Sequence, residues 1–323
     1  MPQPTILLTR RWPAQVESYL AARYEITLNE RDMPLDPQAL QDALRSFDAV
    51  CPTVTDRLTV QVLQAGATRC RILGNYGVGV SHIDLAACRE AGIVVTNTPD
   101  VLTESTADLA VLLMLMVARR AGEGERQVRA GAWPGWSPTH HLAADVSGKT
   151  LGVLGFGRIG QATARKAQRG FCMRILYHSR RRVSPAVEAV TGAVHCATPE
   201  ELLGQADFVS LHCPGGAETR HLLDAARLGL MRRSAFLINT ARGEIILEDA
   251  LVDALRTGRI AGAGLDVYEH EPRVPAGLAD LPNVVLLPHL GSATLETRVA
   301  MGMRVAENLD RFFAGLEPHD RVA

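Results

Sequence analysis

Short runs of apolar residues alternate with amphipathic segments along the whole chain. The first group of runs is TILLT, YEITL, DAVCP, RILGNYG and IVVTN, and the second is KTLGVLGFG, MRILYHS, FVSLHCP, SAFLINT, AGAGLDV and NVVLLPH. Because these runs are apolar at nearly every position, they are typical of strands covered by helices on both faces. Strands that alternate with helices indicate parallel sheets. The pattern therefore predicts an α/β protein with two doubly wound parallel sheets.

Two segments are long enough to be helices of several turns. LAVLLMLMVA, residues 109–118, falls well short of the roughly 20 apolar residues that cross a bilayer, so it predicts a buried helix. A second helix is expected over residues 295–314, and its pattern does not say which sheet it covers. Composition agrees: 323 residues suffice for about two domains, and 47% apolar and 21% charged residues are ordinary for a globular chain.

Charge and cysteine usage narrow the classes of function. A formal net charge of −1 argues against a surface for nucleic acid or membrane. Six cysteines lie mostly in apolar surroundings without CxxC spacing, so they predict neither a disulfide framework nor a metal site. Such cysteines suit a reducing cytoplasm. The first residues, MPQPTILLTRRW, look like a first strand rather than a signal peptide.

A glycine-rich turn opens the second group of strands and carries Gly155-x-Gly157-x-x-Gly160 between a predicted strand and a predicted helix. In such a turn the first glycine permits the sharp bend, the second lets the backbone approach a pyrophosphate, and the third lets helix and strand pack closely. The N–H groups at the start of the helix then bind the phosphates. The motif in this context predicts a Rossmann-like dinucleotide-binding unit.

The next strand ends in LYHSRRR, at the point where NAD-selective chains place a carboxylate for the ribose hydroxyls. No Asp or Glu occurs between residues 178 and 185. The hydroxyl of Ser179 and the guanidinium groups of Arg180 and Arg181 can instead bind a 2′-phosphate. We therefore expect NADPH as the cofactor and leave use of NADH open. The alternative is that the arginines form a solvated loop. Arg182, which lies furthest from the strand, fits this alternative best.

Three later segments place polar side chains after apolar strands, where ligands of open α/β sheets bind. Arg242 follows FLINTA, His289 follows NVVLLP, and GLDVYEHEP carries Asp266, Glu269 and Glu271. An arginine fork can bind a carboxylate, and a histidine beside a carboxylate can donate a proton. Each residue also has a purely structural interpretation, as a strand-end histidine, a surface arginine or a carboxylate at a helix start.

These residues complete a resemblance to the D-isomer-specific 2-hydroxyacid dehydrogenases that runs nearly from end to end. It rests on NYGVGVSHID, VTNTPDVLTESTAD, the glycine-rich turn, NTARG, GLDVYEHEP and PHLGSAT, in this order and at compatible spacings. GWSPTHHL, LYHSRRR and GSATLETRVAMG are similar to the glyoxylate/hydroxypyruvate reductase branch, with 2-ketogluconate reductases close by. The resemblance implies an NAD(P)-dependent enzyme that reduces a small 2-oxo acid, glyoxylate or hydroxypyruvate, to the 2-hydroxy acid.

The resemblance assigns catalytic roles to Arg242, Glu271 and His289. Arg242 would bind the substrate carboxylate and polarise its carbonyl, and His289 would donate the proton to the carbonyl oxygen. Glu271 would hold the other ring nitrogen of His289 and favour imidazolium, the form that reduction consumes. We expect Glu269 to be an exposed neighbour without a role.

The resemblance also implies contacts with the cofactor and the substrate. Asp266 would face the nicotinamide carboxamide, and the backbone of Val78 and Gly79 would bind the substrate carboxylate. The cofactor would meet Thr106, Gly155, Phe156, Gly157, Arg158, Ile159, Gly160, Ser179, Arg180, Arg181, Cys213, Pro214, Thr240, Ala241, Arg242, Asp266, His289 and Gly291. The substrate would meet Val54, Val78, Gly79, Arg242, His289 and Ser292.

The arrangement of domains follows from the same resemblance. A Rossmann-like cofactor domain, residues 99–291, would be inserted into a flavodoxin-like substrate domain made of residues 1–98 and 292–323. The helix around Leu109 and the loop AGAWPGWSPTHH would form a homodimer interface. Trp136 would either reach the active site of the partner subunit or only pack at the interface.

Several alternatives stay open. A 2-ketogluconate reductase or another D-2-hydroxyacid dehydrogenase would share these residues, because the expected pocket wall CPTVT does not fix the substrate side chain. Formate dehydrogenases pair the histidine with Gln, and phosphoglycerate dehydrogenases usually keep an acidic residue after the second strand, so both fit less well. A dehydrogenase-like corepressor, which binds NAD(H) without catalysis, is the alternative from another class, and the presence of Arg, Glu and His together disfavours it.

Overall fold

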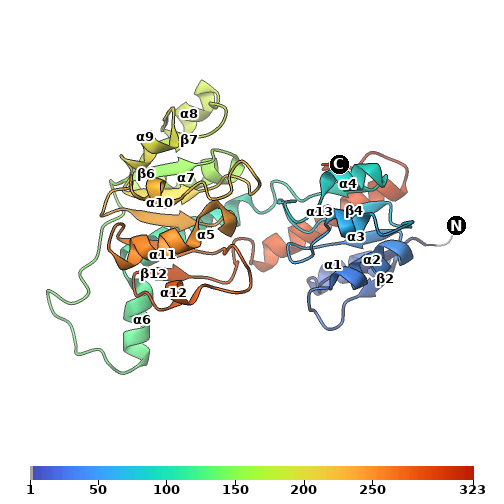
Figure 1. Cartoon of the computed structure of the whole chain (residues 1–323), viewed down its shortest axis with the longest axis horizontal. Coiled ribbons are helices and arrows are strands. Elements are labelled where there is room, and N and C mark those ends of the chain that lie inside the picture. Colours follow the sequence, from blue (N-terminus) through green and yellow to red (C-terminus); the bar gives the residue numbers. More distant parts are fainter. Residues whose placement is uncertain (1–2) are drawn as a thin grey trace. The chain divides into compact units, whose positions relative to one another are not determined.

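The computed structural model describes residues 3–323, which divide into two compact units. Unit 1 runs to Leu102 and resumes at Ser292, and unit 2 comprises Thr103–Gly291. Each unit holds one parallel sheet with helices packed on it (Figure 1). The predicted fold class, two doubly wound α/β units, is therefore confirmed. The first division falls after Leu102 rather than after Thr98.

Unit 1 is built on five parallel strands in the order β2-β1-β3-β4-β5, the order of flavodoxin-like sheets. The strands are β1 (Thr5–Leu8), β2 (Glu25–Leu28), β3 (Ala49–Cys51), β4 (Ile72–Gly74) and β5 (Val94–Thr96). The helices are α1 (Ala14–Ala21), α2 (Pro37–Ser46), α3 (Val60–Leu63), α4 (Leu85–Glu90) and α13 (Leu295–Phe313). The helix that the sequence could not place, α13, packs against α1 and β4.

The last residues of the chain are tied to the end of β5. Val322 N donates to Val95 O at 2.7 Å, and Val95 N donates to Ala323 O at 2.9 Å. The buried carboxylate of Asp320 accepts from Arg304 Nε at 2.6 Å on α13. These contacts fix the position of the segment that follows β5.

Unit 2 has seven parallel strands in the order β12-β11-β10-β9-β6-β7-β8. They are β6 (Thr150–Leu154), β7 (Arg174–His178), β8 (Ala193–His195), β9 (Phe208–Leu211), β10 (Phe236–Asn239), β11 (Gly262–Leu265) and β12 (Val284–Leu286). The order reverses between β6 and β9, and such switch points are where open α/β sheets bind ligands. Strand β8 was not predicted, because it is a three-residue edge strand and its central Val194 is exposed.

Helices and turns cover both faces of this sheet. They are α5 (Thr103–Ala118), α6 (Ala121–Arg129), α7 (Arg158–Phe171), α8 (Pro185–Thr191), α9 (Pro199–Leu203), α10 (Ala225–Leu228), the 3₁₀ turn η1 (Gly243–Ile245), α11 (Glu248–Arg256) and α12 (Ala276–Ala279). Helices α5 and α7 contribute to the core on one face, and α9 and α11 contribute to the core on the other. Strands buried on both sides account for their nearly continuous apolar character.

Residues 109–118, predicted as a buried helix, form most of helix α5, which is buried except along its outer side. Helix α5 buries Leu113, Met114 and Val117 against the sheet, but Leu112 on its outer side is 44% exposed. Across residues 3–323, no helix combines the length and apolar character that a membrane span requires.

Candidate active site

The glycine-rich turn lies at the switch point of the unit 2 sheet, between β6 and α7. Gly155 has a φ of 92°, and a Cβ there would overlap the backbone at His212 and Cys213 after β9. A Cβ on Gly160 would overlap the carbonyl oxygen of Gly155. At Gly157, by contrast, no atom lies within 4 Å of the Cβ position. Packing therefore requires the first and third glycines, whereas the second leaves open space at the first turn of α7, as a bound pyrophosphate needs.

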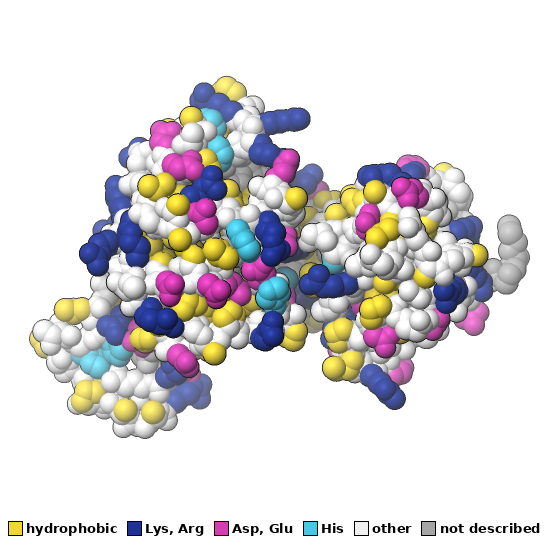
Figure 2. Space-filling model, in the orientation of Figure 1, with side chains coloured by type: hydrophobic (Ala, Val, Ile, Leu, Met, Phe, Trp, Pro, Cys, Tyr) yellow, Lys and Arg dark blue, Asp and Glu magenta, His cyan; other side chains and the backbone are white. Residues whose placement is uncertain are grey.

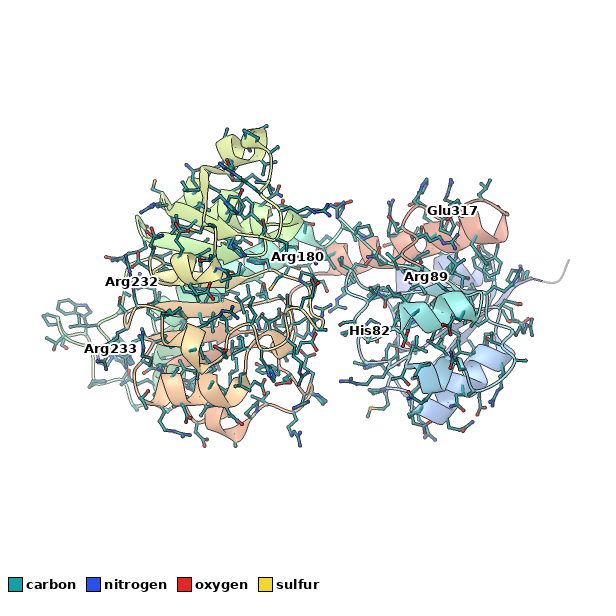
Figure 3. All side chains as sticks on the ribbon, turned by 45° about the horizontal axis from the view of Figure 1, so that its top comes forward. His82, Arg89, Arg180, Arg232, Arg233 and Glu317 are labelled. Atoms are coloured by element: carbon teal, nitrogen blue, oxygen red, sulfur yellow. The ribbon has the colours of Figure 1, made fainter. Side chains whose placement is uncertain are left out.

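The polar segment after β7 carries the residues predicted to bind a 2′-phosphate. Ser179 Oγ donates to Arg181 O at 2.7 Å, and Arg180, which is labelled in Figure 3, forms an ion pair with Glu218 at 2.6 Å. Both side chains of this pair are more than 70% exposed. The side chain of Arg181 is exposed, and its guanidinium makes no hydrogen bond or ion pair with any residue from 3 to 323. Arg180 and Arg181 are therefore available at the surface beside the turn.

Arg182 has a different partner. Its Nε donates to Glu188 at 2.8 Å on α8, and the Tyr177 hydroxyl donates to the same carboxylate at 2.6 Å. These two hydrogen bonds lower the pKa of Glu188 to about 2. Arg182 therefore anchors α8 rather than extending the phosphate-binding pair, as its distance from the strand end suggested.

His289 and Glu271 form the central pair of the site. His289 follows β12 with a φ of 56°, and its Nδ1 lies 2.8 Å from Glu271 Oε2. Burial acts to raise the pKa of Glu271, but the hydrogen bond and positive charge of His289 outweigh it and hold this pKa below its ordinary value. Glu271 is consequently ionised near neutral pH and orients the imidazole, so that Nε2 is the ring atom left for chemistry.

Arg242 lies next to this pair, in the segment that follows β10. Its guanidinium Nη1 donates to Ala241 O at 2.6 Å, and the charge of Glu271 acts on it. Burial lowers the pKa of Arg242, although a guanidinium keeps its proton in proteins. A Cβ on Gly243 would overlap the backbone at Tyr268 and Glu269, which shows how closely the Arg242 segment approaches the Glu271 segment. The arrangement brings one cation, one carboxylate and one imidazole together at the ends of three strands.

Asp266 supports the backbone that carries His289. It is fully buried, and its carboxylate accepts from Leu290 N at 2.6 Å and Gly291 N at 2.8 Å. Its own carbonyl accepts from His289 N at 2.9 Å. Thr106 Oγ1 donates to Gly291 O at 3.1 Å and holds the same segment from α5. Burial raises the pKa of Asp266. This positioning role of Asp266 and Thr106 was not predicted from the sequence.

The other predicted residues lie where their strands place them. Burial raises the pKa of Cys213 to about 11, so its thiol is neutral, and Pro214 after it is exposed. Thr240 is buried, and its hydroxyl has no hydrogen-bond partner within residues 3–323. The remaining predicted substrate contacts fall in unit 1 or at the surface: Val78, Gly79 and Ser292 are half-buried, Val54 is 41% exposed, and Trp136 of unit 2 is 83% exposed.

The prediction that Glu269 is exposed is wrong. Its side chain is only 9% exposed and accepts from Arg220 at 2.5 Å and from His221 Nε2 at 3.0 Å. These two contacts connect the loop after β9, which carries Arg220 and His221, to the segment that carries Glu271. No local pattern could indicate it, because the partners lie 49 and 48 residues away along the chain.

Comparison with known proteins agrees with this geometry. Residues 111–291 match the family model described as D-isomer specific 2-hydroxyacid dehydrogenase, NAD binding domain. The chain belongs to this family. It is accordingly an NAD(P)-dependent oxidoreductase, as the resemblance of its motifs implied.

Alignments with relatives extend over nearly the whole chain. A glyoxylate reductase of Thermococcus onnurineus is 44% identical over 98% of this chain and 95% of its own length. A crystal structure titled as a putative D-isomer specific 2-hydroxyacid dehydrogenase from Polaromonas covers 100% of both chains at 37% identity and a TM-score of 0.93. A structure of an NADPH-dependent glyoxylate/hydroxypyruvate reductase from Sinorhizobium meliloti, in complex with NADP and malonate, covers 99% of this chain and 97% of its own at 36% identity and a TM-score of 0.88.

The two kinds of glycine in the turn should respond differently to substitution. Gly157→Ala should leave the thermal midpoint of unfolding unchanged, because the added Cβ meets no protein atom, but should raise the Kd of the dinucleotide about tenfold or more by filling its space. Gly155→Ala should lower stability by about 1–3 kcal/mol, since it adds both overlap and a strained φ. Calorimetry and cofactor fluorescence measure both quantities. Equal loss of stability in the two variants would contradict this division of roles.

Proposed function

We propose that this protein is an NADPH-preferring reductase of small 2-oxo acids, with glyoxylate or hydroxypyruvate as substrate. The observation that carries the proposal is the 2.8 Å contact between His289 Nδ1 and Glu271, with Arg242 beside it. Such a group can bind an anionic 2-oxo acid and protonate its carbonyl. The names of the relatives, glyoxylate reductase and glyoxylate/hydroxypyruvate reductase, support the same substrate class.

When bound, the nicotinamide supplies the hydride for reduction. Arg242 binds the substrate carboxylate and polarises the carbonyl through its planar donors. His289, as imidazolium, gives the proton on Nε2 to the carbonyl oxygen and becomes neutral. Glu271 stabilises the imidazolium before transfer and keeps the ring oriented. Solvent then returns the proton to His289.

Three observations support the fit of this chain's residues to the cofactor. The open space at Gly157 and the N–H groups at the start of α7 suit the pyrophosphate. Ser179, Arg180 and Arg181 suit a 2′-phosphate, and the exposed Arg180–Glu218 pair costs little to exchange for it. Asp266 and Thr106, which hold the backbone of residues 290 and 291, would border the nicotinamide end.

The domain roles and the remaining substrate contacts belong to the same proposal. Unit 2 would be the cofactor domain and unit 1 the substrate domain, in which the amides of Val78 and Gly79 bind the substrate carboxylate. Val54 and Ser292 would contact the rest of the substrate. The six cysteines are all unpaired, which suits a cytoplasmic enzyme.

We further propose a homodimer formed through α5, α6 and the loop that follows α6. Helix α6 and the loop after it project from unit 2 (Figure 1), and this projecting part carries hydrophobic side chains on its surface (Figure 2). Those side chains are strongly exposed: Val128, Trp133, Trp136 and Leu142. Exposed aromatic and aliphatic side chains in one projecting segment are typical of a surface that a partner covers. Trp136 would then contact the active site of the partner subunit.

A substrate panel tests the function directly. With NADPH, we expect turnover of glyoxylate and hydroxypyruvate, followed by absorbance of the nicotinamide, to exceed turnover of pyruvate and 2-ketogluconate. His289→Ala should lower kcat by about 10²–10⁴-fold, because it removes the proton donor. Its affinity for NADPH provides the control for correct folding. Near-normal turnover by this variant would overturn the proposed mechanism, and preference for 2-ketogluconate would correct the substrate.

Replacing the carboxylate that faces His289 should change the pH dependence. Glu271 carries a depressed pKa, so it stays charged across the neutral range and favours imidazolium. In Glu271→Gln the carboxylate charge that faces the ring is lost, so the pH optimum for reduction should move down. A profile of kcat/KM against pH measures this. An upward shift would be incompatible with Glu271 stabilising the protonated ring.

The choice of cofactor should depend on Arg181 and not on Arg182. Arg181→Ala should reduce the ratio of kcat/KM for NADPH to that for NADH by about tenfold, the loss of one charge-assisted hydrogen bond. Arg182→Ala is the matched control, because its side chain is bound to Glu188. A ratio that is unchanged in Arg181→Ala, or a wild-type preference for NADH, would remove the basis for NADPH selection.

A further inference from the structure

The loop between β4 and α4, residues 75–82, contains no lysine or arginine. The proposed function nevertheless assigns the substrate carboxylate to it, and the present inference rests on that assignment. Without these cations, the backbone N–H groups of the loop are its main donors for an anion, and they act only if they point toward it. The question is what determines the direction of these peptide groups.

Side-chain amides hold three consecutive carbonyl groups of the loop. Asn75 Nδ2 donates to Gly77 O at 2.9 Å and to Gly79 O at 3.1 Å. Asn97 Nδ2 donates to Val78 O, the carbonyl between them, at 2.9 Å. Every carbonyl oxygen from residue 77 to residue 79 is thus bound by an asparagine.

Fixing these oxygens also fixes the N–H groups that follow them. In a trans peptide the C=O and the next N–H point in opposite directions, because the peptide unit is planar. The amides of Val78, Gly79 and Val80 therefore point away from the asparagine that holds the preceding carbonyl. Within residues 3–323, none of these three N–H groups donates a hydrogen bond. They are unused donors in a loop without lysine or arginine.

We propose that Asn75 and Asn97 are positioning residues that preset this loop to bind the substrate carboxylate. With the carbonyls held by asparagines, the positive ends of three peptide dipoles are presented to the anion before it arrives, so binding needs no reorganisation. If a peptide turned over, its carbonyl oxygen would face the carboxylate and repel it.

The asparagines are themselves fixed by their surroundings. Asn75 is fully buried, and its Oδ1 lies 3.0 Å from Nε2 of His82, which is labelled in Figure 3. Because Asn75 Nδ2 donates to two carbonyls, Oδ1 is the acceptor and His82 Nε2 the donor. Asn97 N donates to Asp320 O at 3.2 Å, so the C-terminal segment holds the second asparagine. His82 and Asp320 therefore support the loop through Asn75 and Asn97.

Two variants test the proposal. Asn75→Leu keeps the volume of the side chain but removes its donors, and Asn97→Ala does so at a half-buried position. In each, the KM for glyoxylate and the Kd of oxamate for the NADPH complex should rise about tenfold, the loss expected for one charge-assisted hydrogen bond. Because the carboxylate is bound equally before and during reaction, kcat should change by less than about threefold. The Kd of NADPH should stay unchanged.

Asn29→Ala is the matched control. Asn29 Nδ2 also bridges two carbonyls of unit 1, Thr9 O at 2.8 Å and Met33 O at 2.7 Å, but in another loop. This variant should bind oxamate like the wild type, so that general loosening of unit 1 is separated from loss of the carboxylate site.

The outcomes separate this inference from the proposed function. Unchanged oxamate affinity in Asn97→Ala overturns the inference, even if Asn75→Leu fails to fold, and so does wild-type protein that binds no oxamate. Equal weakening in Asn29→Ala overturns it too, since the effect would then be structural. If the wild type binds oxamate but reduces no 2-oxo acid, the proposed function fails, whereas a selective loss in the two variants still supports the positioning role.

Discussion

The parallel pairing of the unit 2 strands is the constraint from which the site follows. Because β6, β7, β9, β10, β11 and β12 run in the same direction, the segments that follow them all emerge at one edge of the sheet. That edge collects the glycine-rich turn, the arginine segment, Arg242, Asp266 and His289. These residues are scattered over more than a hundred positions of sequence, and their meeting depends on strand order alone. The reversal between β6 and β9 leaves room there, and Gly155 can approach the backbone at Cys213 only because it lacks a Cβ.

At this edge, burial and neighbouring charges shift the pKa values of the site residues in opposite directions, and the contacts of each residue decide the net shift. Burial would protonate Glu271 and discharge Arg242, but each stands in the field of the other, and His289 adds a hydrogen bond to the carboxylate. At Asp266, burial outweighs the hydrogen bonds from two backbone N–H groups and the charge of His289, and its pKa is raised. Glu271 is therefore an ionised partner for the imidazole of His289, whereas Asp266 holds the backbone of the segment that carries His289. The left-handed φ of His289 is retained because Asp266 holds the backbone on both sides of it.

Much of this could be predicted from the sequence, and the exceptions have physical reasons. Strands covered on both faces have an unmistakable apolar pattern, so all the predicted strands form, whereas β8 is short, lies at an edge and exposes Val194. The motifs indicated Arg242, Glu271 and His289 because each follows a strand. Contacts between distant residues left no such signal: the ion pairs of Arg180 with Glu218 and of Glu269 with Arg220, and the hydrogen bonds of Asp266 with residues 290 and 291, all depend on the folded chain.

The chain uses two different devices for the two anions that its proposed chemistry requires. The 2′-phosphate would meet exposed arginines. Arg180 forms an exposed ion pair with Glu218, which it could give up for the phosphate at small cost in free energy. The carboxylate would meet N–H groups whose directions are fixed by Asn75 and Asn97, without any mobile charge. A cofactor anchored far from the reacting atoms tolerates such adaptation, whereas a substrate of a few atoms does not, because an error of about 1 Å in its position can cost about 10²-fold in rate. In the proposed function, rigid backbone donors would bind the substrate and flexible cations would bind the adenosine end, so each device would suit the precision that its ligand demands.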